Sequence, residues 1–329
     1  MPDLYDVAAI GNAIVDVIAP ADDAFLTDNK LDKGAMMLVD AEQSAALYAK
    51  MAAGVETSGG SAGNTIAGVA SFGGKAAYLG KVADDQLGKV FAHDMRAVGA
   101  HFATPPLVDG KATAVSMINV TPDGQRTMCT FLGASVEFTD ADVDKDVIEG
   151  AKIVYLEGYL FDAEAARRAF AKAAALAHGS GRMIALTLSD GFVVERHRDG
   201  LMGFIESQVD LLFANETELK ALFRTDDFNQ ALHALRPHVK IAAVTRGEKG
   251  SVVIDHGERL TVDAAPVDKV VDTTGAGDQY AAGFMFGLSR GRSLQRCGQL
   301  ASLAAAEVIS HYGPRPLVSL KDLAASKGY

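Results

Sequence analysis

The chain has 329 residues and 49% of them are apolar, which suffices for one large α/β domain or two smaller ones. Its net charge of −11 argues against general binding of nucleic acids or anionic membranes, because such binding needs a basic surface. The N terminus lacks a signal-peptide pattern, no apolar run approaches the roughly 20 residues that span a bilayer, and two cysteines do not indicate a disulfide framework. We therefore expect a cytoplasmic protein that binds neither nucleic acid nor membrane.

Segments typical of strands and of helices alternate along most of the chain. The expected strands are 6–10, 76–79, 153–156, 183–188, 211–214, 241–245 and 251–254. The expected helices are 41–53, 63–72, 86–98, 163–178, 217–223, 228–235, 277–288 and 294–310. This order predicts an α/β fold with a parallel sheet covered on both faces, whose ligands bind beyond the carboxyl ends of the strands.

Two regions break the alternation. Residues 15–39 are irregular and strand-like, and residues 113–131 contain a hairpin signal with strands at 115–120 and 126–131 around Thr-Pro-Asp-Gly. We expect these pieces to pair into a small sheet outside the main one. No internal repeat or linker is evident, so the prediction is one domain over 1–329 with these two inserted segments.

The most informative string is Asp272-Thr-Thr-Gly-Ala-Gly-Asp278, which follows a β-branched run at 269–271 and opens a helical pattern. Small residues at a strand-to-helix junction leave backbone N–H groups uncovered, and these donors, with the helix dipole, can hold an anion. Asp278 falls in the first turn of that helix, where a carboxylate can take a proton from a hydroxyl that attacks a phosphorus held by the loop. The alternative interpretation is a tight turn and helix cap.

Two strings near the N terminus offer groups for hydroxyls. In Ser58-Gly-Gly-Ser-Ala-Gly-Asn64, the pair Gly59 and Gly60 lets a ligand approach the backbone, and Asn64 supplies a donor and an acceptor. Asp16, just after the first expected strand, can accept hydrogen bonds from two adjacent hydroxyls. The alternative interpretation of 58–64 is a loop that caps a helix, and that of Asp16 is a solvated residue in a turn.

Two further strings follow expected strands. Asn215-Glu-Thr-Glu218 carries amide and carboxylate oxygens that suit Mg²⁺, although the same residues suit a helix N terminus, and both can hold together. Thr245-Arg-Gly-Glu-Lys-Gly250 lies between two expected strands and, taken alone, is consistent with a hairpin. The sequence contains no P-loop, and its histidines lack the spacing of metal ligands.

Together these strings resemble the signatures of the ribokinase-like (PfkB) family of carbohydrate and nucleoside kinases, in family order across essentially the whole chain. The resemblance implies a ribokinase-like, parallel-rich sheet with helices on both faces, and a small β lid formed by segments near 15–39 and 113–131. It also implies ATP-dependent phosphoryl transfer to a hydroxymethyl group, with Asp278 as the base. The backbone N–H groups of Gly275, Ala276 and Gly277 would stabilise charge on the transferred group.

The resemblance assigns the other site residues. Asp16 would clamp the ribose and accept a hydrogen bond from Asn64. The remaining substrate-binding candidates are Asn12, Gly59, Gly60, and Leu132 and Tyr159 in an apolar slot. The nucleotide-binding candidates are Asn215, Thr245, Gly247, Gly275 and Gly277. Asn215 and Glu218 would hold Mg²⁺ through water, Asp272 and Thr274 occupy the place of a monovalent cation such as K⁺, and Arg126 would either close over phosphate or lie on the surface.

A purine nucleoside is favoured by a departure from the sugar-kinase pattern at 61–64, by the segment 155–161 and by the apolar lid strand at 128–132. Ser61 and Gly63, and the segment 155–161, are more similar to adenosine kinases. We therefore predict conversion of adenosine to AMP with ATP and Mg²⁺, by a monomer or homodimer. The alternatives are another purine nucleoside such as inosine or guanosine, a sugar such as ribose or fructose, and a non-catalytic nucleotide sensor, which would need the glycine loop but not the base.

Overall fold

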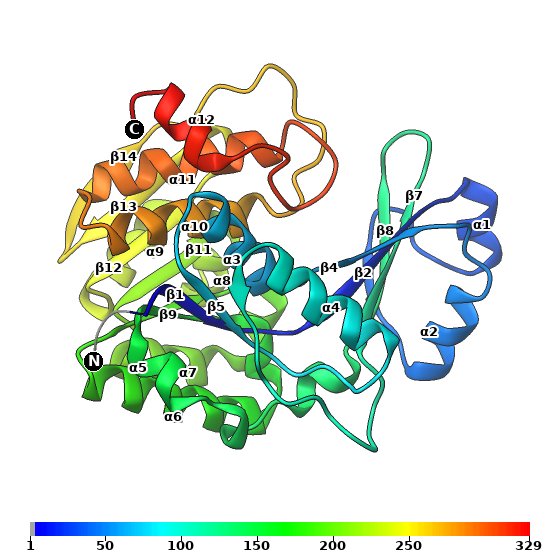
Figure 1. Cartoon of the computed structure of the whole chain (residues 1–329). Coiled ribbons are helices and arrows are strands. Elements are labelled where there is room, and N and C mark those ends of the chain that lie inside the picture. The colour runs from blue at the N-terminus through cyan, green and yellow to red at the C-terminus, as the bar shows by residue number, and fades with distance from the viewer. Residues whose placement is uncertain (1–3) are drawn as a thin grey trace.

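The centre of the computed structural model, which describes residues 4–329, is a nine-stranded sheet (Figure 1). In spatial order its strands are β14 (Glu258–Val262), β13 (Ser251–Asp255), β12 (Ile241–Thr245), β11 (Leu211–Asn215), β10 (Met183–Thr187), β9 (Ala151–Glu157), β1 (Tyr5–Ile10), β5 (Ala76–Leu79) and β6 (Ala100–His101). Neighbours from β12 to β6 are parallel, whereas β13 and β14 add an antiparallel edge. The carboxyl ends of the parallel strands therefore share one edge, where ligands bind in sheets of this kind.

Helices cover both faces of this sheet. One face carries α5 (Lys145–Gly150), α6 (Glu164–Gly179), α7 (Gly191–Gln208), α8 (Glu216–Phe223) and α9 (Phe228–Leu235). The other carries α3 (Ser61–Ser71), α4 (Gln86–Ala97), α10 (Ala276–Ser289) and α11 (Leu294–Val308), with α12 (Leu320–Ser326) packed outside them. Alternate residues of β1 point into the two apolar cores: Ala8 and Ile10 into one, Val7 and Ala9 into the other. The expected α/β fold with a doubly covered, parallel-rich sheet is confirmed.

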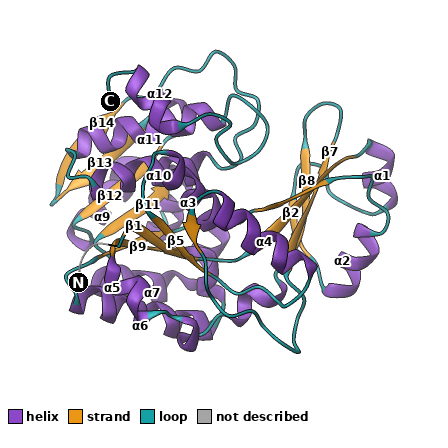
Figure 2. Ribbon diagram, in the orientation of Figure 1, coloured by secondary structure: helices purple, strands orange, loops and turns teal. Residues whose placement is uncertain are grey.

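A smaller sheet of five strands projects from this body (Figure 2). Its order is β3 (Met36–Leu38), β8 (Arg126–Phe131), β7 (Ala114–Val120), β2 (Ile14–Pro20) and β4 (Val55–Ser58), and α1 (Asp23–Asp28) and α2 (Ala41–Tyr48) flank it. The expected hairpin is confirmed, since β7 and β8 pair antiparallel with Val120 opposite Arg126. Because β2 begins four residues after β1 ends, this sheet starts directly from the ligand-binding edge of the large one.

Several predicted boundaries were wrong. The β-branched run at 269–271, which precedes the glycine loop, is irregular; no strand pairs with it among residues 4–329, and the Val271 N–H donates to the Ile309 carbonyl (2.8 Å). The helix expected over 41–53 ends at Tyr48, because the chain must turn to enter β4. The region 15–39 holds two strands and a six-residue helix.

The long helix α7 was not predicted. It begins at a glycine, contains two more, and has non-helical dihedral angles at His197, so its apolar period is interrupted. Within residues 4–329, no helix is both long and apolar enough to cross a membrane.

Candidate active site

Polar residues converge where the parallel strands end. Asn12 follows β1, Glu157 ends β9, and Asn215 and Thr245 end β11 and β12. In register, Ile10 lies beside Leu156, and Asn215 beside Thr245. The structure therefore places Asn12, Asn215 and Thr245, three of the predicted site residues, along one edge of the sheet.

The carboxylate of Asp278 lies where the N termini of two helices meet. It accepts a hydrogen bond from Ser61 Oγ (2.6 Å) and another from Asn64 Nδ2 (3.2 Å), both in α3. Gly275 forms the N-cap of α10 with φ 78°, and a Cβ there would approach Pro314 to 2.6 Å, so glycine is required. No side chain of residues 4–329 caps this helix end, although the Ala276 N–H donates to the Thr273 carbonyl oxygen (3.2 Å), and the positive end of the helix dipole favours an anion here.

Burial sets the protonation behaviour of Asp278. Burial raises the pKa of Asp278 to about 6, while hydrogen bonds from Ser61 and Asn64 and the charge of Arg315 oppose that rise. The carboxylate is therefore ionised near neutral pH but close enough to titration to accept a proton. This is the behaviour that a general base requires.

Asp16 faces the glycine pair across a short gap. A Cβ on Gly59 would lie 2.3 Å from the Asp16 carboxylate, so only glycine allows this approach. Burial raises the pKa of Asp16 to about 6, against the charges of Arg315 and Arg126. Its carboxylate accepts no hydrogen bond from residues 4–329. The expected bond from Asn64 to Asp16 was wrong, because the Asn64 amide donates to Asp278 instead.

Glu157 was missed by the sequence analysis. Its Oε1 accepts from the backbone N–H (3.3 Å) and Nδ2 (2.9 Å) of Asn12, and its Oε2 accepts from the N–H of Ala62 (2.8 Å). Burial raises the pKa of Glu157 to about 7. The remaining oxygen, Asn12 Oδ1, is buried without a hydrogen-bond partner among residues 4–329. A carboxylate at the end of an apolar strand was the signal that could have revealed Glu157.

Arg315 was also missed. It lies in a loop, Gly313-Pro-Arg-Pro316, between α11 and α12, and its Nε donates to Asn64 Oδ1 (3.2 Å). A cation within a Gly- and Pro-rich segment, in a chain of negative net charge, was the available signal. The sequence alone could not bring residue 315 to residue 64.

Arg126 forms an ion pair with Asp272, and both side chains are less than 10% exposed, at 8% and 7%. The surface alternative for Arg126 was therefore wrong. Asp272 also accepts from Thr274 N (3.0 Å), Thr274 Oγ1 (2.7 Å) and Gly313 N (3.0 Å). Burial acts to raise the pKa of Asp272, but these hydrogen bonds and the charge of Arg126 outweigh it and lower the pKa.

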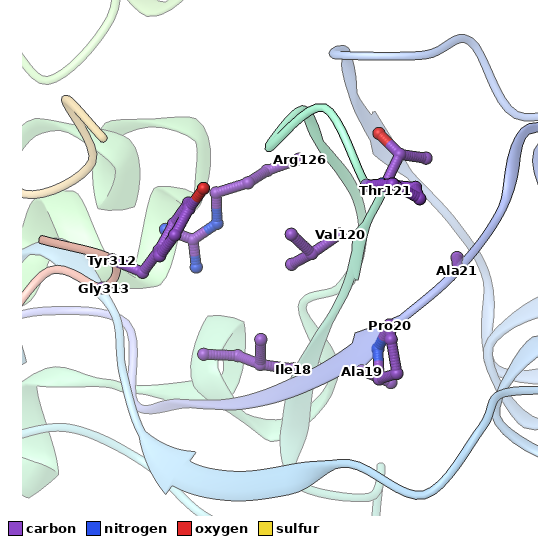
Figure 3. Close-up of a pocket in the computed structure, with 10 residues that line it drawn as sticks. Ile18, Ala19, Pro20, Ala21, Val120, Thr121, Arg126, Tyr312 and Gly313 are labelled. Carbon is purple, nitrogen blue, oxygen red and sulfur yellow. The ribbon is translucent and has the colours of Figure 1, made fainter. Parts of the chain in front are cut away.

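This ion pair connects the smaller sheet to the segment that opens the glycine loop. Beside it, Arg126 and Tyr312 lie on one side of a pocket of about 470 Å³, and Pro20 and Ala21 lie on the other (Figure 3). The charge of Asp272 at the predicted cation position is balanced by Arg126. The monovalent cation stays a prediction.

A second pocket, of about 640 Å³, borders the glycine loop at Thr273, Ala276 and Gly277. Three predicted nucleotide-binding residues, Thr245, Gly247 and Gly277, line it. Much of the remaining wall is apolar and includes Ala264, Ala265, Pro266, Val267, Val270, Tyr280, Ala305, Ala306 and Ile309. Its volume and mixed lining are typical of a small-molecule site. Asn215 and Gly275 are outside its wall.

Asn215 and Glu218 bond to each other at the start of α8. Asn215 donates its N–H (2.9 Å) and its Nδ2 (2.6 Å) to the two oxygens of Glu218, and Asn215 Oδ1 accepts from the Glu218 N–H (2.8 Å). The helix-cap interpretation is confirmed by this geometry. Burial raises the pKa of Glu218 to about 7. The Asn215 amide and the Glu218 carboxylate suit Mg²⁺, because this ion binds few protein groups and keeps most of its water.

Leu132 and Tyr159, predicted to flank an apolar slot, are both half-buried. Leu132 follows β8, and Tyr159 lies two residues beyond Glu157 in a short turn of 3₁₀ helix, Gly158–Asp162. Burial, and then the negative charges of Asp190, Glu157 and Asp278, raise the pKa of Tyr159. Tyr159 is therefore within electrostatic range of Asp278. Its part in a slot stays a prediction.

The comparisons with known proteins agree with this geometry. Residues 6–320 match the family described as pfkB family carbohydrate kinase. Over 331 residues the chain is 28% identical to the adenosine kinase of Saccharomyces cerevisiae, with 94% of this chain and 96% of that protein covered. It is 54% identical to the adenosine kinase from Sinorhizobium meliloti, whose structure superimposes with a TM-score of 0.92 over 98% of this chain and 99% of that one. It is 50% identical to a probable sugar kinase protein from Rhizobium etli CFN 42, with a TM-score of 0.93 over 99% of each chain. The chain therefore belongs to the pfkB family of carbohydrate kinases.

Proposed function

We propose that the chain transfers the γ-phosphoryl group of ATP to the 5′-hydroxyl of a purine nucleoside, adenosine above others, and releases AMP and ADP. In this reaction the hydroxyl oxygen bonds to the γ-phosphorus, the bond from that phosphorus to the β,γ-bridging oxygen breaks, and the hydroxyl proton goes to Asp278. The observation that carries the proposal is the position of Asp278. It stands in the first turn of α10, next to a helix N terminus that no side chain caps within residues 4–329, and its neighbour Gly277 lines the 640 Å³ pocket.

The glycine loop supports phosphoryl transfer through fixed dipoles. The N–H groups of Gly275, Ala276 and Gly277 lie at the positive end of α10, where they would stabilise charge on the transferred group; that of Ala276 also donates to the Thr273 carbonyl oxygen (3.2 Å). The Asp278 carboxylate is held by Ser61 and Asn64 rather than by a cation in direct contact, so it keeps its basicity. Orientation and electrostatics are what this reaction needs most from a protein.

The acceptor would lie between Asp16 and Asp278. The Asp16 carboxylate has no hydrogen-bond donor from residues 4–329 and faces Gly59, so it is available to two adjacent hydroxyls. Asn12 Oδ1, held in place by Glu157 and unpaired, is a second acceptor for a substrate donor. Gly60 and Asn64 border the same space. These groups suit a ribose, and Tyr159 and Leu132 remain our candidates for the face of the base.

ATP would occupy the 640 Å³ pocket, with its base against the apolar wall and its phosphates toward Gly277. Mg²⁺, when bound, neutralises phosphate charge and orients the phosphates. Asn215 and Glu218 would hold it through water, since each already bonds to the other. The smaller sheet would act as a lid that excludes water, a competing acceptor, and the Arg126–Asp272 pair fixes that sheet next to the glycine loop.

A sugar kinase is the second candidate, because one similar structure is described as a probable sugar kinase. The two are separated by measuring ADP release with Mg²⁺ and ATP over adenosine, inosine, guanosine, ribose and fructose. Adenosine should exceed ribose in kcat/KM by at least about 10²-fold, on the order of 3 kcal/mol of differential transition-state binding. A better rate with ribose or fructose contradicts the nucleoside assignment. ATP binding without turnover on any acceptor favours the nucleotide sensor.

A further inference from the structure

The loop at 313–316 brings a guanidinium group close to both carboxylates of the site. Arg315 Nε donates to Asn64 Oδ1 (3.2 Å), and a Cβ on Gly63 would lie 3.9 Å from one terminal nitrogen of Arg315. The charges of Asp16 and Asp278 both act on this guanidinium. Arg315 is therefore a cation within electrostatic range of both carboxylates.

The loop that carries Arg315 is held firmly. Gln279 is fully buried, and its Nε2 donates to the carbonyl oxygens of both Asn64 (2.9 Å) and Pro314 (3.0 Å). Pro314 also packs against Gly275 so closely that no Cβ fits between them. One side chain of α10 thus fixes the loop relative to α3, directly beside Asp278.

The guanidinium determines which way the Asn64 amide points. An arginine only donates hydrogen bonds, so the atom of Asn64 that faces Arg315 must be the oxygen. The NH₂ group then points to the Asp278 carboxylate, which only accepts. Without Arg315 the amide is free to turn its oxygen toward Asp278, where two acceptors would repel each other.

We propose that Arg315 is a positioning residue for the phosphoryl transfer: it orients the Asn64 amide toward Asp278, and its positive charge stabilises the carboxylate form of the base. The inference rests on the proposed role of Asp278. Arg315 touches neither the reacting hydroxyl nor the phosphoryl group in this account. It acts through Asn64 and through its charge.

The charge balance around Asp278 supports the second half of this role. The ionisable groups that face Asp278 are Asp16 from β2, Tyr155 and Glu157 from β9, Tyr159 after β9, and Arg315. Arg315 is the one cation in that set, while burial and the negative charges of Asp16 and Glu157 favour the protonated acid. Loss of its charge should raise the pKa of Asp278, so that a larger share of the enzyme is protonated and inactive near neutral pH.

The test compares pH profiles of kcat/KM, for the best acceptor found in the screen, in the parent enzyme and in Arg315→Gln, Arg315→Lys and Arg196→Gln. Arg196 pairs with Asp162 on the surface and controls for loss of one positive charge elsewhere. In Arg315→Gln the acid limb should move upward by about one pH unit, whereas in Arg196→Gln it should stay in place. An Arg315→Gln limb that coincides with the parent limb overturns the inference.

The lysine variant keeps the charge but not the geometry of the donor. Its acid limb should remain near that of the parent, while kcat falls roughly 10-fold because Asn64 is no longer oriented. If Arg315→Gln does not fold, as judged by circular dichroism, a parental kcat in Arg315→Lys overturns the inference on its own. Asp278→Asn separates the two claims. A fully active Asp278→Asn variant defeats the role of Asp278. If Asp278→Asn is inactive but the acid limb of Arg315→Gln coincides with that of the parent, only the role of Arg315 is defeated.

Discussion

Asn64 Nδ2 lies 3.2 Å from Asp278 Oδ2, although 214 residues separate them in the chain. This contact joins the N terminus of α3, which carries the substrate-side residues, to the N terminus of α10, which carries the phosphate-side loop. In the proposed reaction, this contact would hold the group that takes the proton at a fixed distance from the residues that bind the acceptor. In our account, the geometry of the reaction depends on this contact.

The reaction should depend on pH through the two buried carboxylates. Burial raises the pKa of Asp278 and of Asp16 to about 6 each, so both are ionised above that pH and both gain protons as the pH falls through it. Proton acceptance and hydroxyl binding are then lost together. We expect kcat/KM for adenosine to be level above about pH 7 and to fall steeply below about pH 6. A profile that stays level down to about pH 5 would show that neither carboxylate acts in its ionised form.

Asp16 should contribute mainly to acceptor affinity. Asp16→Asn removes the ionised acceptor from a buried position, so we expect acceptor binding to weaken by about 1–3 kcal/mol with a smaller change in kcat. Steady-state kinetics and calorimetry with adenosine measure this, with Asp32→Asn, an exposed position in the same region, as the matched control. If the parent enzyme binds 2′-deoxyadenosine as tightly as adenosine, Asp16 is not a clamp on adjacent hydroxyls.

The Arg126–Asp272 pair should stabilise the fold as well as the site. Because both side chains are buried, Arg126→Met leaves an unpaired carboxylate and should lower the free energy of unfolding by about 3–5 kcal/mol. The double variant Arg126→Met with Asp272→Asn should recover part of that loss, because no charge is then left alone. Urea unfolding of the two single variants and the double variant measures the coupling. Strictly additive losses in the free energy of unfolding would mean that Arg126 and Asp272 do not stabilise each other.

Much of the architecture was predictable because apolar periodicity reports burial directly. The strand at 241–245 and the helix at 228–235 matched the prediction residue for residue, since continuous apolar strands and regular helical spacing are local signals. The helix α7 was missed because its glycines and the distortion at His197 disturb that spacing. The β-branched run at 269–271 is not a strand, because such a run forms a strand only where a partner strand is present.

The site was predictable in its loops and less so in its contacts. Glycine strings and the residues beside them are local in sequence, so Asp16, Asn64 and Asp278 were identified before their positions were known. Glu157 and Arg315 bond to partners more than 90 residues away in the chain: Glu157 to Ala62, and Arg315 to Asn64. Side chains whose function consists in a tertiary contact carry no local pattern. The mutual bonding of Asn64 and Asp278, in place of Asn64 and Asp16, has the same origin.

The most direct test of the account is the formation of AMP from adenosine by the parent enzyme and by Asp278→Asn. The substitution keeps the size of the side chain but removes proton acceptance, so turnover should fall on the order of 10²–10⁴-fold while ATP binding changes little. The measurement is AMP and ADP by chromatography at saturating ATP and Mg²⁺, with ATP affinity measured separately by calorimetry. Equal AMP and ADP from the parent, and near-complete loss of both in the Asn variant, is the predicted result. Near-normal AMP formation by Asp278→Asn, or no AMP from the parent enzyme, would contradict the account.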